Sequence, residues 1–421
     1  MQAPSPSPAR ISSRTFQHAH PVPHPLAVLH MTGYVGRVCG GLSRIALGLA
    51  RAQRDLAMRP TIHCLDDVHG VIRAADTGPV GGLLHVSRPL GPGWIGYSPQ
   101  GERWTSAPEA GRYQILHQHG IWYAFSRSTN SWRRRWQRPV VVAPQGTLET
   151  EALRFSKWKK VIAARLYEGQ NLGEAACLQA TSYQEAESFR RFGLRNPIAV
   201  IANGIDDEWI DAPGDATAFR RALGIRPDRR ILLFLSRVHP KKGVPLLLEA
   251  YERAGRAMDG WELVIAGPAE DPAYLDALRR RAARISGSGP IHFTGPLLGE
   301  MRRNAFAAAD VFVLPTLSDN FAMVVAEALG AGVPALVTEG AHPWRILNDE
   351  RCGWWVPTTP GSLADALRTA AGSAPAELAA MGTRGRVLAR RYAWSHIAKQ
   401  TDALYRWLLG NGRRPAFVLK D

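Results

Sequence analysis

The sequence predicts an α/β protein with two domains, each built around a parallel sheet. Its 421 residues, 45% of them apolar, are too many for one ordinary core and suit two domains of roughly 200 residues each. Residues 309–337 show a buried strand, a polar turn, a helix and a second buried strand, which together make one βαβ unit. Residues 203–215 combine Gly, Pro and several Asp, a composition typical of a hinge between domains.

These signals divide the chain into consecutive segments. Residues 1–24 are rich in Pro, Ser, His and Arg and cannot bury enough apolar surface to fold, so we expect a flexible tail there. The rest is expected to form an N-terminal Rossmann-like domain at 25–205, a hinge at 206–225, a C-terminal Rossmann-like domain at 226–391 and a terminal helical segment at 392–421.

Two features of the N-terminal half are candidates for ligand binding. The pair Gly40-Gly41 closes the loop after the first strand, where glycine lets backbone N–H groups approach a phosphate, although a plain turn is its commoner role. His119 ends the third strand beside Gly120, at the edge where parallel sheets bind ligands, with a hydrogen-bonded structural histidine as the alternative. We predict strands at 26–30, 61–65, 113–119, 140–143, 176–181 and 199–201, helices at 42–57 and 183–192, and loops with short strands at 78–110.

The C-terminal half places charged residues at two helix N-termini. Arg237 and Lys242 lie between a strand and a helix, so their charges and the free N–H groups of the helix would converge on one anion; ordinary surface charge is the alternative. Asp319 precedes a second helix and Glu327 lies within it, and an N-cap with a paired helix residue is the alternative there. We predict strands at 231–235, 261–266, 292–294, 311–315 and 334–337, and helices at 244–257, 321–329 and 394–409.

The composition indicates which partners the protein could bind and which cellular compartment suits it. The formal charge of +16 predicts attraction to something anionic. Residues 127–160 interleave Lys and Arg with Trp and Phe, which fits an anionic membrane surface or a solvated basic face, and the lack of a nucleic-acid-binding motif argues against nucleic acid. The scattered cysteines indicate neither disulfides nor structural zinc, so a reducing cytoplasm fits best; they are Cys39, Cys64, Cys177 and Cys352. No apolar run reaches the roughly 18 residues of a membrane span, so we expect a soluble protein or one peripheral to the inner face of the membrane.

Several motifs occur in the order of one known family. The acid at 319, the Phe two residues on, the second acid at plus eight and the Gly-x-Pro that follows resemble the Glu-x7-Glu signature of the retaining family 4 glycosyltransferases, which have the GT-B fold. The run 117–120 resembles the family's His-x-His-Gly element, and 203–206 resembles its Asn-Gly-Ile/Val-Asp run. The resemblance covers roughly residues 27–405. The chain departs from the family in having Asp319 for Glu, Ala322 for Gly and Gln145 for a frequent His.

The resemblance implies two Rossmann-like domains facing each other across a cleft, with the final helix crossing back to the first domain. The implied reaction moves a sugar, with retention, from a nucleotide-diphospho donor to a glycan or lipid-linked acceptor, as in cell-surface polysaccharide assembly. No metal or other cofactor is implied, and the chain has no Asp-x-Asp triplet. The implied site comprises Arg237, Lys242, Gly40, Gly41 and the helix start at Phe321, Ala322 and Met323 around the diphosphate, Asp319 at the sugar hydroxyls, Glu327 at the ribose and His119 near C6 of the sugar.

Two alternatives remain open from the sequence. A nucleotide-sugar epimerase with the same two domains would need no acceptor. A non-catalytic GT-B protein would bind a sugar nucleotide or glycan as a scaffold, and Asp319 and Ala322 are the departures that keep this alternative open.

Overall fold

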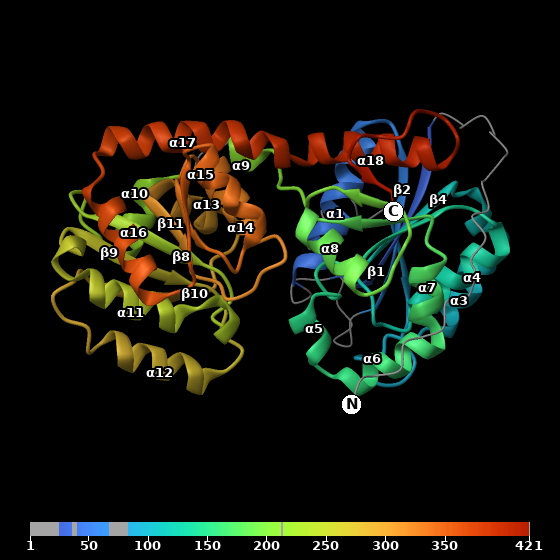
Figure 1. Cartoon of the computed structure of the whole chain (residues 1–421), viewed down its shortest axis with the longest axis horizontal. Coiled ribbons are helices and arrows are strands. Elements are labelled where there is room, and N and C mark those ends of the chain that lie inside the picture. The colour runs from blue at the N-terminus through green and yellow to red at the C-terminus, as the bar shows by residue number, and fades with distance from the viewer. Residues whose placement is uncertain (1–24, 36–39, 67–82, 212–213, 421) are drawn as a thin grey trace.

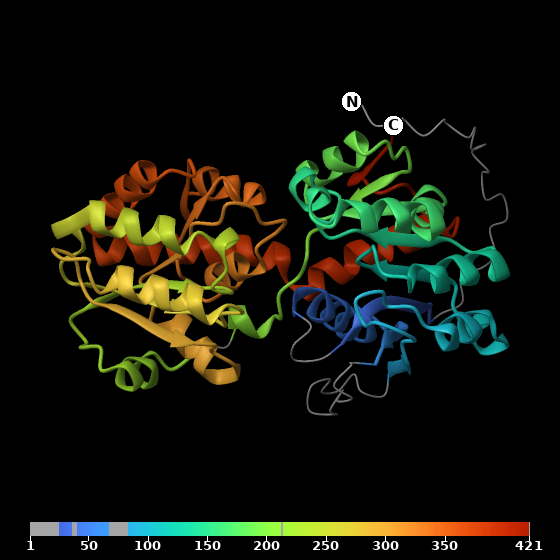
Figure 2. The same ribbon diagram turned by 90° about the horizontal axis from the view of Figure 1, so that it is seen from below.

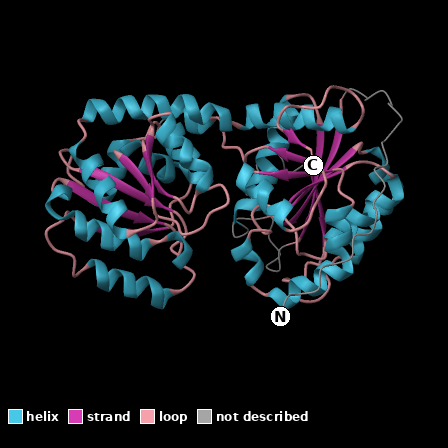
Figure 3. Ribbon diagram, viewed as in Figure 1, coloured by secondary structure: helices cyan, strands magenta, loops and turns pink. Residues whose placement is uncertain are grey.

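Two α/β domains lie side by side in the computed structural model, which describes residues 25–35, 40–66, 83–211 and 214–420 (Figure 1). The predictions for the tail at 1–24, for Cys39 and for residues 36–39 lie outside this described part. Each domain is a sheet with helices on both faces, as the colouring by secondary structure makes plain (Figure 3). The sequence-based prediction of two Rossmann-like domains is confirmed.

The N-terminal sheet has the strand order β14-β7-β6-β5-β4-β1-β2-β3. All neighbouring pairs are parallel except β14 with β7. The chain builds outward from the centre in both directions, so β1 and β4 form the topological switch point, where such sheets bind ligands. The strands are β1 (Ala27–Tyr34), β2 (Arg59–Leu65), β3 (Leu84–Ser87), β4 (Ile115–His119), β5 (Val140–Ala143), β6 (Cys177–Ala180), β7 (Ile198–Val200) and β14 (Val418–Leu419).

The C-terminal sheet has the order β10-β9-β8-β11-β12-β13 and is parallel between all neighbours. Its switch point lies between β8 and β11. These central strands are buried on both faces, which explains why each appears in the sequence as an unbroken apolar run. The strands are β8 (Arg230–Leu235), β9 (Trp261–Ala266), β10 (Ile291–Gly295), β11 (Val311–Leu314), β12 (Ala335–Thr338) and β13 (Gly353–Val356).

Helices cover both sheets, and none of those described is long and apolar enough to cross a bilayer. In the N-terminal domain they are α1 (Gly40–Asp55), α3 (Pro99–Ser106), α4 (Ser126–Trp136), α5 (Thr150–Arg154), α6 (Lys157–Ala163), α7 (Gly169–Gly173) and α8 (Tyr183–Arg191). Later in the chain come α9 (Glu208–Asp211), α10 (Ala216–Leu223), α11 (Val244–Ala254), α12 (Pro272–Ala282), α13 (Gly299–Ala308), α14 (Met323–Gly330), α15 (Ile346–Asp349), α16 (Pro360–Gly372), α17 (Pro375–Ala389) and α18 (Trp394–Leu408).

Three local predictions need correction. The first strand continues to Tyr34, beyond the predicted end at residue 30, because its residues as far as Gly33 stay buried. Residues 78–110 contain a helix, α3, whose start is fixed by Ser98 accepting a hydrogen bond from the Gly101 N–H with Pro99 at the first position. Residues 206–225 are largely helical where an irregular hinge was predicted, and α10 packs on α13 of the C-terminal domain.

The last long helix joins the domains. Helices α17 and α18 run along one side of both domains, and the view from below shows α18 crossing from the C-terminal domain into the N-terminal domain (Figure 2). Helix α18 packs on α1, with the Trp394 indole between Gly48 and Gly204. A Cβ at either glycine would overlap that indole ring. These two glycines therefore make room for the side chain that docks α18 on the N-terminal domain.

Candidate active site

The loops that follow β8 and β11 meet at the switch point of the C-terminal sheet. The carbonyl of Lys241 accepts hydrogen bonds from Thr316 Oγ1, at 3.0 Å, and from the Leu317 N–H, at 2.8 Å. Gly243 has φ +72° and lies so close to the Pro315 carbonyl that a Cβ there would overlap it. Glycine is therefore required for this approach of the two loops.

Lys242 and Asp319 form an ion pair between these loops. Their side chains are only 15% and 16% exposed, so the pair is largely shielded from water. Asp319 Oδ1 also accepts from the Ala322 N–H at 3.2 Å. Asp319 thus accepts from the N–H of Ala322, the residue just before α14, and pairs with a cation at the same time.

Helix α14 begins at Met323, two residues later than predicted. Ala322 has φ 54° and ψ 62°, a left-handed conformation that costs about 1–2 kcal/mol for a residue with a Cβ, and this delays the helix. Phe321 is buried against Trp344 and Tyr392, with ring centroids 5.4 and 5.5 Å away, so its side chain belongs to the core. What this turn offers a ligand is the first N–H groups of α14, which lack partners within the helix.

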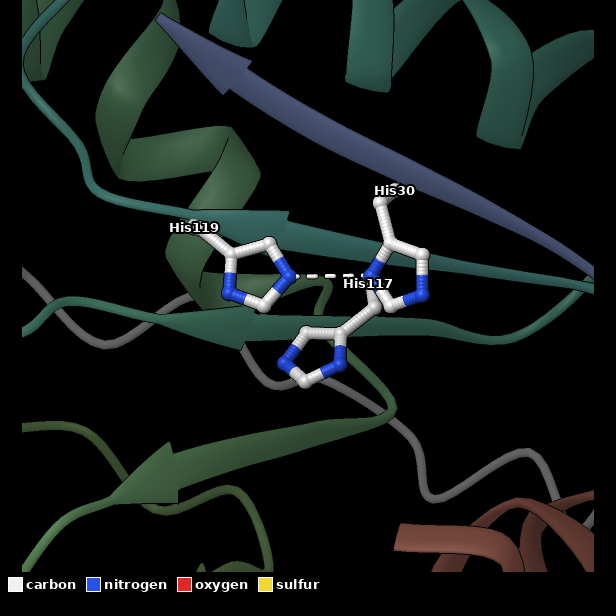
Figure 4. Close-up of side chains that lie close together, drawn as sticks. All are labelled: His30, His117 and His119. Carbon is white, nitrogen blue, oxygen red and sulfur yellow. Dashed lines mark hydrogen bonds between the residues drawn. The ribbon is translucent and has the colours of Figure 1, made fainter. Parts of the chain in front are cut away.

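The switch point of the N-terminal sheet carries buried histidines. His30 lies opposite His117, and Thr32 opposite His119, in the register of β1 with β4. His119 Nε2 lies 2.9 Å from His30 Nδ1 (Figure 4). Burial lowers the pKa of His119 well below its ordinary value, and the neighbouring His30 lowers it further. Neutral imidazoles therefore occupy this edge at physiological pH.

The carboxyl edges of the two sheets face each other through a contact at Asn320. This residue follows Asp319, and its side-chain amide nitrogen donates to Thr181 Oγ1, which follows β6, at 3.1 Å. Gly146, which follows β5, lies so close to Asn320 that a Cβ there would overlap it. The C-terminal loop that carries Asp319 therefore touches the N-terminal loops after β5 and β6.

Comparisons with known proteins identify a separate family match for each of the two domains. Residues 40–204 match the family described as "Glycosyl transferase 4-like domain", and residues 229–372 match "Glycosyl transferases group 1". The two matched ranges cover the N-terminal and the C-terminal domain respectively. The chain is a glycosyltransferase of the family 4 type. The glycosyltransferase has the GT-B fold, as the solved structures below also indicate.

Individual relatives are distant but span almost the whole glycosyltransferase. D-inositol 3-phosphate glycosyltransferase 2 of Catenulispora acidiphila is 28% identical over 394 residues, 87% of this chain and 90% of that protein. The GDP-mannose:cellobiosyl-diphosphopolyprenol alpha-mannosyltransferase of Komagataeibacter xylinus is 27% identical over 399 residues, 91% of this chain and 94% of that protein. Anabaena HepE, crystallised with UDP and glucose, superposes with a TM-score of 0.71 at 18% identity, over 90% of this chain and 98% of that one.

Glu327 of the glycosyltransferase lies in α14 with its carboxylate fully buried and held by two arginines. Arg44 of α1 donates to one oxygen at 2.8 Å, and Arg302 of α13 donates to the other. Attraction to Glu327 raises the pKa of Arg44, whereas burial lowers that of Arg302. Glu327 was predicted to accept a hydrogen bond from the ribose of the nucleotide. In this structure both of its carboxylate oxygens are already bound to arginines, and one of these, Arg44, belongs to the N-terminal domain.

In this structure Arg237 does not lie beside Lys242, as the sequence had predicted it would. Its side chain is 57% exposed and forms an ion pair of 3.0 Å with Glu270, in the loop after β9. Met323 contacts hydrophobic residues of both domains.

The prediction of a glycine loop after the first strand needs correction, because Gly40 and Gly41 are the first two residues of α1 and not the end of a loop. A Cβ at Gly41 would meet nothing within 4 Å, so no close approach requires glycine there.

Several residues at the junction escaped the sequence analysis. Glu185 accepts from the N–H groups of Gly146 and Thr181, and burial raises its pKa. Burial, followed by the charges of Glu185 and Asp319, raises the pKa of Glu149 to about 7. Arg44 and Arg302 lie 283 and 25 residues from Glu327, so no spacing rule could have paired them with it. Glu149 was visible only as an acid directly after the Pro-Gln-Gly-Thr-Leu run.

Proposed function

We propose that this glycosyltransferase takes a sugar from a nucleotide-diphospho donor bound at the C-terminal edge and transfers it, with retention, to an acceptor held by the N-terminal domain. The Lys242–Asp319 pair at the start of α14 carries the proposal. It brings a cation and an anion from two loops together beside the helix N–H groups, which suits the diphosphate and the hydroxyls of a nucleotide sugar. The complexes of HepE with UDP-glucose and with UDP and glucose support this class of donor.

Charge neutralisation is the main catalytic task in this proposal. As the bond between sugar and diphosphate breaks, negative charge grows on the leaving group, and Lys242 with the first N–H groups of α14 stabilises it. Arg237 is exposed enough to leave Glu270 and join them. Asp319 then accepts from the sugar hydroxyls, and His119 orients the reacting sugar from the N-terminal edge. Such a mechanism needs neither a covalent nucleophile nor a metal clamp.

A lipid-linked acceptor is favoured by an exposed surface on α5 and α6. Phe155, Trp158, Ile162 and Leu166 are 60%, 64%, 48% and 68% exposed, and Lys and Arg side chains lie between them. We call residues 154–166 the α5–α6 surface. Apolar side chains among basic ones suit the headgroup region of an anionic membrane. The name of the Komagataeibacter enzyme, which contains a diphosphopolyprenol, supports a lipid-linked acceptor. We therefore propose a role in cell-surface polysaccharide assembly at the inner face of the membrane.

Membrane binding is tested by sedimentation with vesicles of anionic or neutral lipid. Each Lys or Arg near an anionic surface contributes about 1 kcal/mol, so binding should fall steeply as salt rises. Changing Phe155 and Trp158 to Ala should weaken binding, whereas Leu298→Ala, at a side chain 71% exposed on the other domain, should not. Equal binding to neutral vesicles would contradict an electrostatic contribution, and no binding to either would leave the α5–α6 surface as a plain solvated face.

The reaction is tested by a donor screen that measures nucleoside diphosphate release with and without a lipid-linked glycan. Transfer predicts release that depends on the acceptor and a product whose anomeric configuration, read by NMR, matches that of the donor. An epimerase of this architecture would consume its nucleotide sugar without any acceptor. Donor binding with no turnover under any acceptor would instead support a non-catalytic sugar-nucleotide-binding protein.

A further inference from the structure

Three histidines converge between the N-terminal sheet and the helices that cover it. His30 comes from β1, and His117 and His119 come from β4, so all three project from one face of the sheet (Figure 4). One nitrogen from each ring lies within 4.8 Å of the other two, and all three residues are buried. This is the group among the described residues whose His, Cys, Asp and Glu side chains come close enough to share an ion.

The outward nitrogens of two of these rings have partners of the kind that metal-bound histidines use. His30 Nε2 lies 2.8 Å from Gln53 Oε1 of α1, an acceptor that leaves Nδ1 as the lone-pair nitrogen. His117 Nδ1 lies 2.7 Å from the Tyr405 hydroxyl of α18, which leaves Nε2 as the ring nitrogen without a hydrogen-bond partner. Such contacts fix the tautomer and orientation of histidine ligands.

Polar atoms in and beside the histidine cluster are buried without a hydrogen-bond partner. Within the described part of the chain, His117 Nε2, His119 Nδ1 and Thr32 Oγ1 are buried and have no hydrogen-bond partner. Buried polar groups without partners are uncommon, and an unseen ion is one of their ordinary explanations.

We propose that His30 Nδ1, His117 Nε2 and His119 Nε2 bind one Zn²⁺ ion. Imidazole is a preferred ligand of zinc, and Zn–N bonds of roughly 2.0–2.1 Å place tetrahedral ligand nitrogens roughly 3.3 Å apart. His30 Nδ1 and His119 Nε2 are 2.9 Å apart, so these two rings need to separate by a few tenths of an ångström. The His117 ring, whose ligand nitrogen lies within 4.8 Å of the other two, would need to move toward them. The proton between these two nitrogens moves to His119 Nδ1 when the ion enters. Thr32, whose buried hydroxyl has no partner among the described residues, lies opposite His119 in the strand register.

This ion would have a structural role. It would tie β1 to β4 directly, and through Gln53 and Tyr405 it would tie both strands to α1 and α18. Helix α18 is the element that joins the two domains, so the ion would strengthen the attachment that sets their relative position. The proposal concerns metal binding and domain attachment. His119 belongs to both proposals, so zinc content and turnover are measured separately: absence of zinc overturns this inference alone, and absence of turnover overturns the proposed function alone.

The test uses the full-length protein without an affinity tag, expressed with added Zn²⁺ and separated from free ions by gel filtration. Elemental analysis should find about one Zn²⁺ per chain, and removing it with a chelator should lower the Tm. His117→Asn should abolish binding. Tyr405→Phe keeps the ring packing and removes only the hydroxyl contact, so it should weaken Zn²⁺ binding by about 10–100-fold, the usual effect of losing an outer partner.

Two controls locate the ion. His63→Asn changes another buried histidine, which bonds Ser87 at 2.7 Å, and should leave the zinc content unchanged. Replacing the tail residues His18, His20 and His24 with Gln should also leave it unchanged. Zinc that survives both His117→Asn and Tyr405→Phe but disappears with the tail variant would overturn the proposal, as would a wild-type protein that neither carries nor takes up Zn²⁺.

Discussion

The two switch points of this molecule have opposite electrostatic character. The C-terminal one, between β8 and β11, presents Lys242 and Asp319 as an ion pair that keeps some contact with water. The N-terminal one, between β1 and β4, presents histidines that are fully buried and neutral. The same topology thus provides two environments: one edge with an ion pair, and the other lined by buried imidazoles. We expect the donor at the charged edge for this reason.

The largest effect should come from removing the charge at the C-terminal edge. Lys242→Ala should lower kcat/KM. The loss should correspond to about 2–4 kcal/mol of transition-state stabilisation, as for other preorganised charges. Lys241→Ala is the matched control, because its ammonium lies 4.6 Å from the Phe155 ring centroid and not against Asp319. Equal losses in the two variants would mean that net charge, and not the position of Lys242, determines the rate.

Asp319→Asn separates the two roles of this acid. Asn still caps the Ala322 N–H but has no charge for a sugar hydroxyl or for Lys242, so kcat/KM should fall by about 1.5–3 kcal/mol. The free energy of unfolding should change by about 1 kcal/mol or less. Asp319→Glu should change the ranking of donor sugars. Full activity of Asp319→Asn would show that the residue is only a cap.

The covering of the N-terminal edge is tested with two glycines of α1. Gly48→Ala would push into the Trp394 indole and should cost about 1–3 kcal/mol of stability. Gly41→Ala, where a Cβ meets nothing, should be neutral or stabilising by about 1 kcal/mol. Chemical denaturation of both variants measures the difference. A Gly48→Ala protein as stable as wild type would show that α18 is not held by this contact.

Ala322→Gly should relieve the left-handed turn before α14. The gain in stability should be about 1 kcal/mol or less, because the freedom of glycine in the unfolded chain offsets part of the strain. Thermal unfolding measures it, and Ala331→Gly, at a residue of φ −70° just after α14, is the control that should destabilise. A loss of stability in Ala322→Gly would mean that the turn carries no strain.

The smallest effect concerns pH. Burial raises the pKa of Glu149 to about 7 from its ordinary 4.5, so the folded state binds more protons than the unfolded state between these values. Its contribution therefore makes stability fall as pH rises from about 4.5 to about 7. Glu149→Gln should flatten that fall in denaturation curves recorded across this range. An unchanged slope would show that Glu149 titrates as an ordinary acid.

The sequence predicted the interior better than the junction. Strands β5 and β9 occur at the predicted bounds because each is a continuous apolar run that can only be buried. Helix α14 begins later than predicted because Ala322 adopts a left-handed conformation, which is not expected of an alanine. The pairing of Arg44 with Glu327 joins two domains, and the approach of His30 to His119 joins strands 89 residues apart. Such contacts depend on how the sheets are assembled, which local patterns do not encode.

The central claim is that the charged edge, and not the neutral one, binds the nucleoside diphosphate. Isothermal titration of UDP and GDP into the wild type, Lys242→Ala and His119→Gln tests it directly. The account predicts that Lys242→Ala weakens the tighter nucleotide at least about tenfold, roughly 1.4 kcal/mol, while His119→Gln leaves its Kd nearly unchanged. Unchanged affinity in Lys242→Ala together with a loss in His119→Gln would contradict the account.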